Sequence, residues 1–258
     1  MTSIKLINVM SKIFIIHGWT YTTAKWQEFV GLMQASGFEV VQLTVPGLTE
    51  STDKAWTLET YVEWLKEKLS AESSSASNSA KATSDLQKAT EGKQNPIVIG
   101  HSNGGRIALA FAAKYPDKIK QLILIDSAGI YHNELPLRIK RTVFGAAAKI
   151  GKKITQSETI RKILYKLAGE SDYKNATPQM RKTMANLISA DLAPELSKIT
   201  APTLIIWGAK DKATPLSDGR LMNQQIKNSS LYIIEGAGHS PHATNAKEVA
   251  DVARRFIG

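Results

Sequence analysis

The stretch PIVIGHSNGG, residues 96–105, decides the fold. It joins a short apolar run typical of a buried strand, Pro96–Ile99, to an Ala- and Leu-rich run typical of a helix, Arg106–Tyr115, which ends before Pro116. Between the two runs stands the pattern Gly-x-Ser-x-Gly, with Ser102 at its centre. In this setting the pattern predicts a nucleophile elbow. Such a turn is so sharp that small residues must flank the serine, whose hydroxyl is exposed beside a helix N-terminus.

On both sides of this stretch, short β-type runs alternate with helical runs. The predicted strands are residues 13–16, 38–45, 96–100, 121–126, 203–207 and 231–235, and the predicted helices are residues 23–36, 58–69, 106–115 and 247–257. Alternation of this kind predicts an α/β fold with a mainly parallel sheet flanked by crossover helices. A chain of 258 residues is long enough to bury one such core, so we expect one large domain.

Two segments interrupt the alternation. Residues 70–95 are rich in Ser, Ala, Thr and Lys, which predicts a low-complexity surface insertion, partly disordered, with an interdomain linker as the alternative. The second segment follows the strand that ends near Asp126 and contains helical runs but no β-type run, which predicts a helical lid over Ser102. The predicted organisation is a core of residues 1–129 and 201–258 and a lid of residues 130–200.

The formal charge of +10 is concentrated in the predicted lid, where 13 Lys and Arg stand against six Asp and Glu. A solvated helical face explains such an excess, and a surface that attracts acidic substrates, anionic lipid or nucleic acid is the alternative. No nucleic-acid motif accompanies the charge, so we expect no nucleic-acid partner. Helical periods within residues 139–167 permit amphipathic helices with basic faces, which leaves membrane-surface contact through the lid as a hypothesis.

The composition also bears on location and cofactors. The chain has no cysteine, which excludes disulfides and thiolate metal sites and favours a cytoplasmic protein. No run approaches the length of a membrane span, and residues 1–12 lack the apolar region of a secretory signal, so we expect neither. None of the five histidines forms an i,i+4 pair with a carboxylate or a second histidine on a helix, so we expect no metal and no cofactor.

A serine hydroxyl is a poor nucleophile at neutral pH and needs a base that is itself held by an acid. Two later strand ends supply both groups: Asp211 lies in the loop after strand 203–207, and His239 lies in the Gly-rich loop after strand 231–235. The carboxyl ends of parallel strands face one crevice, so these two side chains are predicted to converge on Ser102. The chain order Ser, Asp, His is that of the α/β-hydrolases.

A serine of this kind also needs donors for the negative charge that develops on the substrate oxygen. His17, Gly18 and Trp19 directly follow the first predicted strand, and the glycine allows the Trp19 amide to turn inward. The amide of Asn103, next to Ser102, is the second predicted donor. Trp19 and Asn103 are therefore the predicted oxyanion hole.

At this point the sequence resembles the α/β-hydrolase superfamily, in particular its lidded serine esterase-like members. The matching pieces are IIHGW, PG, VIGHSNGG, YPDKIKQLILIDSAG, APTLIIWGAKDKATP and IEGAGH, at residues 15–19, 46–47, 98–105, 115–129, 201–215 and 234–239. The resemblance implies hydrolysis of a small or medium carboxylic ester through an acyl-enzyme, with a small-molecule acyl substrate. Thioester, amide and carbon–carbon bond cleavage and acyl transfer are variations on the same machinery.

The resemblance also bears on two rival residues. His242 lies near His239, but the family pattern places the base directly after Gly-x-Gly, which favours His239. Asp126 occupies a strand end where some family members keep their acid, yet it could instead hydrogen-bond a neighbouring loop, and Asp211 is preferred. His17 and His101 resemble structural members of their motifs and are expected to transfer no proton.

Other functions found on this fold fit the sequence less well than ester hydrolysis. Haloalkane dehalogenases and epoxide hydrolases would require an aspartate in place of Ser102. Aminopeptidase relatives need a negative group for the substrate amine, and the predicted lid is mostly basic, with few carboxylates such as Glu134 and Glu170. A slow-turnover binding or sensor protein is the alternative from another class, although such a protein has no physical need for all three groups of the triad. The sequence does not indicate the oligomeric state.

Overall fold

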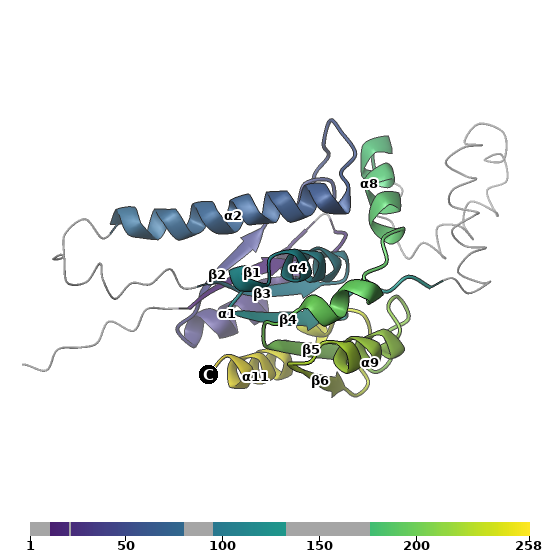
Figure 1. Cartoon of the computed structure of the whole chain (residues 1–258). Coiled ribbons are helices and arrows are strands. Elements are labelled where there is room, and N and C mark those ends of the chain that lie inside the picture. Colours follow the sequence, from purple (N-terminus) through teal and green to yellow (C-terminus); the bar gives the residue numbers. More distant parts are fainter. Residues whose placement is uncertain (1–10, 21, 80–94, 133–175) are drawn as a thin grey trace, which may run out of the picture.

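The computed structural model describes residues 11–20, 22–79, 95–132 and 176–258 (Figure 1). The larger part of the predicted lid, residues 133–175, and residues 80–94 of the predicted surface insertion lie outside these ranges. The division of the chain into core and lid therefore stays a prediction.

The described chain forms a six-stranded sheet in the order β2-β1-β3-β4-β5-β6, and each neighbouring pair of strands is parallel. The strands are β1 (Lys12–Ile16), β2 (Glu39–Leu43), β3 (Ile97–His101), β4 (Gln121–Ile125), β5 (Thr203–Gly208) and β6 (Ser229–Ile234). The predicted α/β class with a parallel sheet is thus confirmed. The strand order reverses between β1 and β3, and in such sheets the crevice at the carboxyl ends of the strands beside this reversal is the usual place for a site.

Successive side chains of a strand point to opposite faces of the sheet, and they form two hydrophobic cores, one on each face. In β1, Phe14 and Ile16 belong to one core, whereas Ile13 and Ile15 belong to the other. Strand β3 is buried along its whole length. Because helices cover both faces, a central strand such as β3 or β5 has no solvent-facing side, which explains why the sequence shows continuous apolar runs there instead of polar–apolar alternation.

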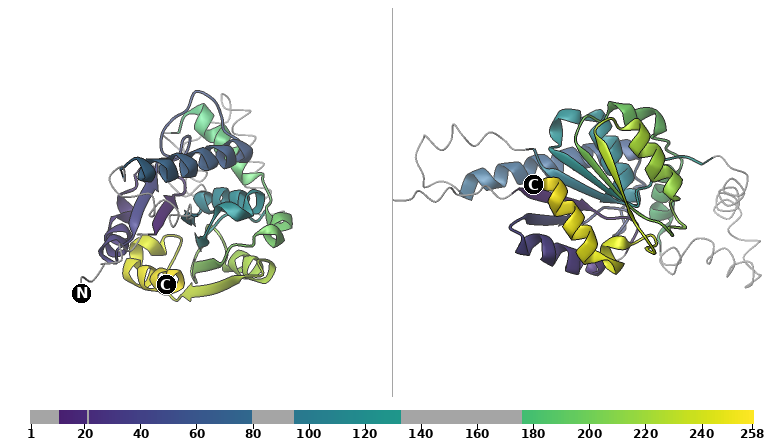
Figure 2. Two further views of the ribbon diagram at one scale, coloured as in Figure 1. Left: turned by 60° about the vertical axis from the view of Figure 1, so that its left-hand side comes forward. Right: turned by 90° about the horizontal axis from the view of Figure 1, so that it is seen from below.

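The helices form a layer on each side of the sheet (Figures 1 and 2). Side chains of α2 (Leu58–Ser79), α4 (Asn103–Lys114) and α9 (Leu216–Gln225) enter the core that contains Phe14, and those of α1 (Gln27–Ala35) and α11 (Ala246–Ile257) enter the other. The remaining helical elements are η1 (Ala24–Trp26), η2 (Pro116–Lys118), α8 (Pro178–Ile188), η3 (Ala193–Lys198) and α10 (Pro241–Thr244).

Helix α2 is longer than the pattern of apolar residues predicts. The predicted helix ends at Leu69, but α2 continues to Ser79, into the segment expected to be a surface insertion. Residues 70–79 contain neither glycine nor proline, and their Ala and Glu residues favour helix without supplying an apolar face. Apolar periodicity therefore marks the buried part of this helix and not its end.

Part of the predicted lid is described and is helical. Helix α8 begins at Pro178, and the Thr177 hydroxyl accepts a hydrogen bond from the Met180 amide (3.2 Å), so both a cap and a first-turn proline define its start. Thr183 and Leu187 of α8 are fully buried. The Thr183 hydroxyl accepts a hydrogen bond from the amide of Trp56 (2.9 Å), which fastens α8 to the chain before α2.

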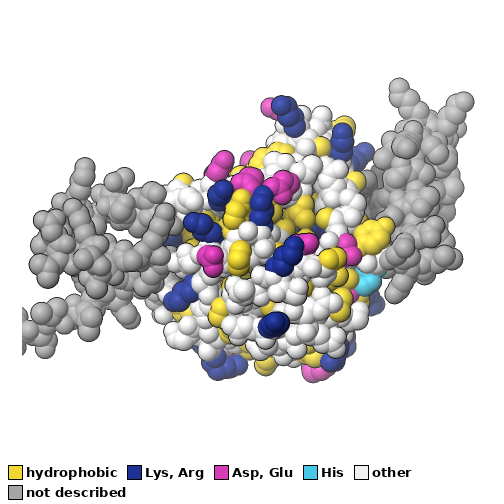
Figure 3. All heavy atoms as spheres, in the orientation of Figure 1, with side chains coloured by type: hydrophobic (Ala, Val, Ile, Leu, Met, Phe, Trp, Pro, Cys, Tyr) yellow, Lys and Arg dark blue, Asp and Glu magenta, His cyan; other side chains and the backbone are white. Residues whose placement is uncertain are grey.

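Charged side chains of both signs are present on the described surface. On the face drawn in Figure 3, Lys and Arg side chains are spread among Asp and Glu side chains. Of the thirteen basic residues in the predicted lid, ten lie between residues 133 and 175, outside the described ranges. Within the described ranges, none of the helices has the length and apolar character needed to cross a membrane.

Candidate active site

The nucleophile elbow predicted from residues 96–105 is present between β3 and α4. Ser102 has a φ of 53° and a ψ of −123°, an unusual conformation for a residue with a side chain, and α4 begins at the next residue. Backbone hydrogen bonds hold this strained residue: its carbonyl accepts from the amides of Ala128 (2.9 Å) and Arg106 (3.2 Å), and its amide donates to Ile125 (3.3 Å). The surrounding backbone therefore imposes the serine conformation.

The turn requires very close approach of neighbouring backbone. A Cβ atom on Gly104 would lie 2.0 Å from the carbonyl oxygen of Ile16, at the end of β1. A Cβ on Gly18 would lie 2.8 Å from the Cβ of Ser102, so the loop after β1 packs directly against the serine. The glycine spacing of the motif is thus a consequence of packing between the elbow and β1.

Replacing Gly104 by alanine is expected to lower the free energy of unfolding by about 3 kcal/mol, because the new Cβ would overlap backbone that cannot rotate away. The matched control is Gly31→Ala in α1, where a Cβ meets nothing within 4 Å. That change is expected to raise the free energy of unfolding by about 0.5–1 kcal/mol, since alanine favours helix. Urea denaturation of both variants measures the difference, and equal effects would contradict the packing argument.

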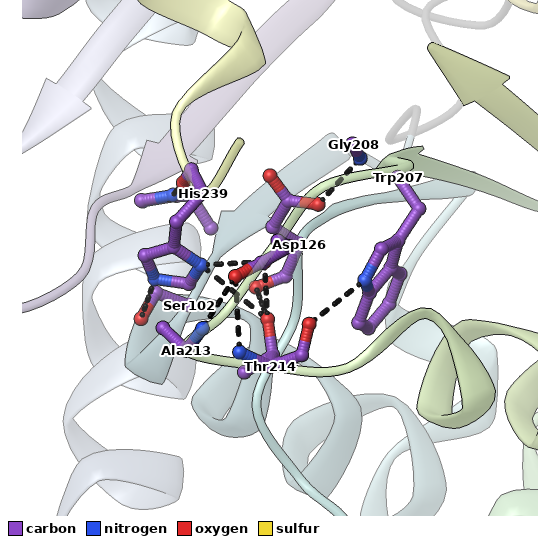
Figure 4. Close-up of polar contacts among 9 residues, drawn as sticks. Ser102, Asp126, Trp207, Gly208, Ala213, Thr214 and His239 are labelled. Atoms are coloured by element: carbon purple, nitrogen blue, oxygen red, sulfur yellow. Dashed lines mark hydrogen bonds and ion pairs between the residues drawn. The ribbon is translucent and has the colours of Figure 1, made fainter. Parts of the chain in front are cut away.

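The three predicted triad residues lie together beyond the carboxyl ends of β3, β5 and β6, and Figure 4 labels Ser102 and His239 of the three. Nε2 of His239 is 3.0 Å from Oγ of Ser102, and Nδ1 of His239 is 2.7 Å from Oδ2 of Asp211. The imidazole therefore lies between the hydroxyl and the carboxylate, with one ring nitrogen toward each. An arrangement of this kind can move a proton from a hydroxyl to a ring nitrogen while a fixed negative charge stabilises the ring.

Asp211 is held by more than the histidine. Its Oδ1 accepts the amides of Ala213 (2.7 Å) and Thr214 (3.1 Å), and its Oδ2 accepts the Thr214 hydroxyl (2.7 Å). Burial works to raise the pKa of Asp211, but the hydrogen bond and charge of His239 and the Thr214 and Ala213 donors together hold that pKa below its ordinary value. The carboxylate is therefore ionised at neutral pH.

Thr214 is not among the residues predicted from sequence. Its hydroxyl reaches Asp211, and it also lies 3.4 Å from Nδ1 of His239. The available signal is local, because an aspartate whose side chain accepts amides two and three residues later forms a recognisable turn. The spacing Asp-x-x-Thr in residues 211–214 fits such a turn.

The rival histidine, His242, occupies a different environment. It is buried and stacked on Trp26, with ring centroids 3.9 Å apart. Burial lowers the pKa of His242 to about 3, so it is neutral. The structure brings His239 to Ser102, and it leaves His242 in the core behind the site.

His101, the residue before the serine, contacts the loop of His239. Its Nε2–H donates to the backbone carbonyl of His239 (2.7 Å), and burial holds the pKa of His101 well below its usual range. His17 lies on the other side, with Nδ1 2.7 Å from the Gly18 carbonyl and Nε2 2.8 Å from the Thr49 hydroxyl. Both rings therefore brace backbone at the site, in line with their expected structural roles.

The two residues predicted to form the oxyanion hole are next to Ser102 or next to a residue that packs against it. Asn103 is the first residue of α4, and Trp19 follows Gly18 and packs half-buried against the core. The side chain of Asn103 is turned toward α8, where Nδ2 lies 3.3 Å from Sδ of Met184. Helix α8 of the predicted lid therefore touches the residue next to Ser102.

Asp126, the rival acid, lies nearby but does not take the place of Asp211. It is fully buried, and its Oδ1 accepts the amide of Gly208 (2.8 Å). One ligand atom each of Asp126, Asp211 and His239 lie within 4.8 Å of one another, a grouping that could hold a metal ion. Two of those three side chains are already paired at 2.7 Å, which favours an acid–base pair over a metal site.

The sequence of this chain is similar to those of known hydrolases and esterases. Residues 8–245 match the family described as serine aminopeptidase, S33. The chain is 26% identical over 96% of its length to the biotin biosynthesis bifunctional protein BioHC of Teredinibacter turnerae, of which it spans 44%. It is 29% identical over 62% of its length to the pimeloyl-(acyl-carrier protein) methyl ester esterase of Neisseria meningitidis, of which it spans 68%.

A solved structure has a similar fold. The α/β hydrolase enzyme MGS-M2 from a Medee basin deep-sea metagenome library has a TM-score of 0.69 and 22% identity, and the match covers 98% of this chain and 90% of that chain. At this identity the likeness shows the fold. The family match begins before β1 and extends past the loop that carries His239, so it includes all six strands. The chain therefore belongs to the serine aminopeptidase S33 family and is an enzyme of the α/β-hydrolase superfamily.

Proposed function

We propose that the chain is a serine hydrolase that cleaves a small or medium carboxylic ester through an acyl-enzyme. Ser102 is the nucleophile, His239 the general base and acid, and Asp211 the residue that holds the imidazole. The proposal rests on one observation, the unbroken sequence of contacts from the hydroxyl through both ring nitrogens to the carboxylate, at 3.0 and 2.7 Å. Both distances are within the reach of direct hydrogen bonding.

In the proposed reaction, Oγ of Ser102 attacks the carbonyl carbon of the ester while its proton passes to Nε2 of His239. Asp211 accepts the Nδ1–H and stabilises the imidazolium. The tetrahedral intermediate collapses, the bond from carbon to the alkoxy oxygen breaks, and the alcohol leaves with the proton from His239. Water then attacks the acyl-enzyme by the same route, which releases the acid and restores the serine.

The amides of Trp19 and Asn103 are the proposed donors to the oxyanion. The close packing of Gly18 against the side chain of Ser102 supports this role, because Trp19 is the residue that follows Gly18 in the chain. The N-terminus of α4 adds partial positive charge beside the serine. One donor of this kind typically contributes about 10²–10³ in rate.

An ester is the proposed substrate because a methyl ester esterase stands among the chain's relatives and because the nucleophile is a serine. This chemistry uses side chains and water alone, so the proposal includes no cofactor. The family description names an aminopeptidase, which makes aminoacyl amides the natural comparison substrates. Membrane-surface contact through the basic segment and a cytoplasmic location remain expectations from the sequence.

Intact-mass analysis after treatment with a fluorophosphonate probe tests the proposal, with the native chain and Ser102→Ala in parallel. Such probes modify a serine that its base and oxyanion hole already activate. One adduct on the native chain and none on the variant is the expected result. An adduct on the variant would place the nucleophile elsewhere, and no adduct on the native chain would favour the slow-turnover binding protein.

Once labelling is established, a panel of esters with acyl chains of increasing length, assayed beside aminoacyl amides, identifies the substrate class. We expect kcat/KM to be larger for esters than for the matched amides. A preference for aminoacyl amides would contradict the ester proposal while leaving the serine mechanism intact.

A further inference from the structure

Asp126 is a buried acidic residue for which the proposed mechanism has no use. It follows β4, is fully buried, and has a φ of 41°. Aspartate and asparagine adopt this left-handed conformation more readily than other residues with a side chain. Burying a carboxyl group costs free energy unless it is well hydrogen-bonded, so its presence behind the site requires a physical reason.

Asp126 contacts both ends of the loop that carries Asp211. At the start of the loop, its Oδ1 accepts the amide of Gly208 (2.8 Å), and at the end its backbone carbonyl lies 3.2 Å from the hydroxyl oxygen of Thr214, which donates its proton to Asp211 (Figure 4). The amide of Asp126 donates to Ile206 of β5 (3.0 Å). One residue thus ties the end of β4 to β5 and to the loop beyond it.

The second carboxyl oxygen of Asp126 indicates the charge state in which it works. Oδ2 is buried and has no hydrogen-bond partner in the described chain. The ionisable side chains that face it from the described chain are Asp211, on the loop after β5, and His239, on the loop after β6. An ionised Asp126 would bury a negative charge with only one of its oxygens hydrogen-bonded, within 4.8 Å of a carboxylate oxygen of Asp211. A neutral carboxyl removes the repulsion between the two charges and lowers the cost of burial.

We propose that Asp126 is a positioning residue that acts as an uncharged carboxylic acid and holds the Asp211 loop in register with His239. The inference rests on the proposed function of Ser102, His239 and Asp211. The Gly208 amide needs only a carbonyl-type oxygen as its acceptor, and a neutral Asp126 carboxyl still provides one. In this proposal Asp211 carries the negative charge, and Asp126 holds the loop that positions Asp211 against His239.

The pKa shifts of the two aspartates agree with these different roles. Burial raises the pKa of Asp126 to about 7, whereas the pKa of Asp211 is held below its ordinary value. Asp126 therefore binds a proton in the folded chain over a pH range in which the unfolded chain has lost it. Stability linked to this group is highest below about pH 4 and falls as the pH rises to about 7, because only the unfolded state ionises freely in that range.

Two substitutions separate positioning from charge. Asp126→Gly removes the side chain but accepts the positive φ, and it is expected to lower kcat about 10–100-fold with KM within about threefold of native. Asp126→Asn keeps an oxygen for the Gly208 amide and has no charge at any pH. It is expected to rescue kcat to within about fivefold of native. A loss in Asp126→Asn as large as in Asp126→Gly would overturn the proposal, and so would an undiminished kcat in Asp126→Gly.

Thermal unfolding provides a second measurement that does not depend on activity. The Tm of Asp126→Asn minus that of the native chain is expected to grow by about 5 °C between pH 4 and pH 7 and then to level off. The matched control, Asp117→Asn, makes the same substitution at an exposed residue and should show no such trend. A flat difference for Asp126→Asn would overturn the neutral carboxyl even if Asp126→Gly fails to fold.

The test also distinguishes this proposal from the proposed function. Fluorophosphonate labelling of the native chain at Ser102 establishes the function whatever the Asp126 variants do. If the native chain does not label, the proposed function fails, and the Tm series still decides whether Asp126 is neutral. If the native chain labels and the rescue by asparagine is absent, only the role of Asp126 fails.

Discussion

Replacing Ser102 by alanine is expected to lower kcat for ester hydrolysis by about 10⁵–10⁶-fold, the largest effect that any single substitution in this chain should produce. The substitution removes the atom that bonds to the acyl group, and His239, 3.0 Å away, then has no hydroxyl to deprotonate. The fold should be unaffected, since the backbone hydrogen bonds that hold residue 102 do not involve its side chain. Steady-state kinetics beside a thermal unfolding scan measure both quantities.

The control for this prediction is the double variant Ser102→Ala/His239→Ala. Because the serine and the histidine act as one unit, removing the second should cost almost nothing once the first is gone. A further loss of 100-fold or more in the double variant would show that His239 works independently of Ser102, which would contradict the proposed base role.

Replacing Asp211 by asparagine is expected to lower kcat by about 10⁴-fold, although the two side chains have the same shape. The amides of Ala213 and Thr214 both donate to Oδ1, so the carbonyl oxygen of an asparagine would be held at that position. Its NH₂ group would then face Nδ1 of His239, where Oδ2 now lies 2.7 Å away. This donor favours the tautomer with a proton on Nε2, and that nitrogen can no longer accept the proton of Ser102.

Thr214→Val provides the matched control for Asp211→Asn. It removes one donor to Oδ2 but leaves the carboxylate and both backbone donors in place. We expect a loss of about threefold to tenfold in kcat, the value of one hydrogen bond to a charged group that other donors still satisfy. The pH dependence of kcat/KM provides a further check. Asp211→Asn should lose activity across the whole neutral range, and recovery to the native value at any neutral pH would contradict the tautomer argument.

The fold was largely predictable because its signals are local or repetitive. Short apolar runs between glycines and prolines marked β1 to β6, and a motif of five residues, 100–104, marked the turn between β3 and α4. The extension of α2 to Ser79 was not predictable from apolar periodicity, because residues 70–79 contain no apolar side chain larger than alanine. Helix α9 was missed for a similar reason, since Met222 is its only residue that combines full burial with a large apolar side chain.

The site was predictable to the level of residue names. Parallel strands bring their carboxyl ends to one edge, so the residues after β3, β5 and β6 had to meet, and the structure places Ser102, Asp211 and His239 within contact distance. The choice between His239 and His242 depended on the Gly-x-Gly pattern in the loop after β6, which directly precedes His239. Only the structure shows that stacking on Trp26 removes His242 from the site.

The sequence by itself determined which residues stand at the strand ends, since strand direction and the turn motif follow from local pattern and backbone sterics. Only the tertiary structure decided what surrounds them: the Gly208 amide on Asp126, the Thr214 hydroxyl on Asp211, and Met184 beside Asn103. Burial and hydrogen bonding arise between segments distant in the chain, and they set the pKa of each carboxyl. Two aspartates that are alike in the sequence therefore differ in the direction of their pKa shift once the chain has folded.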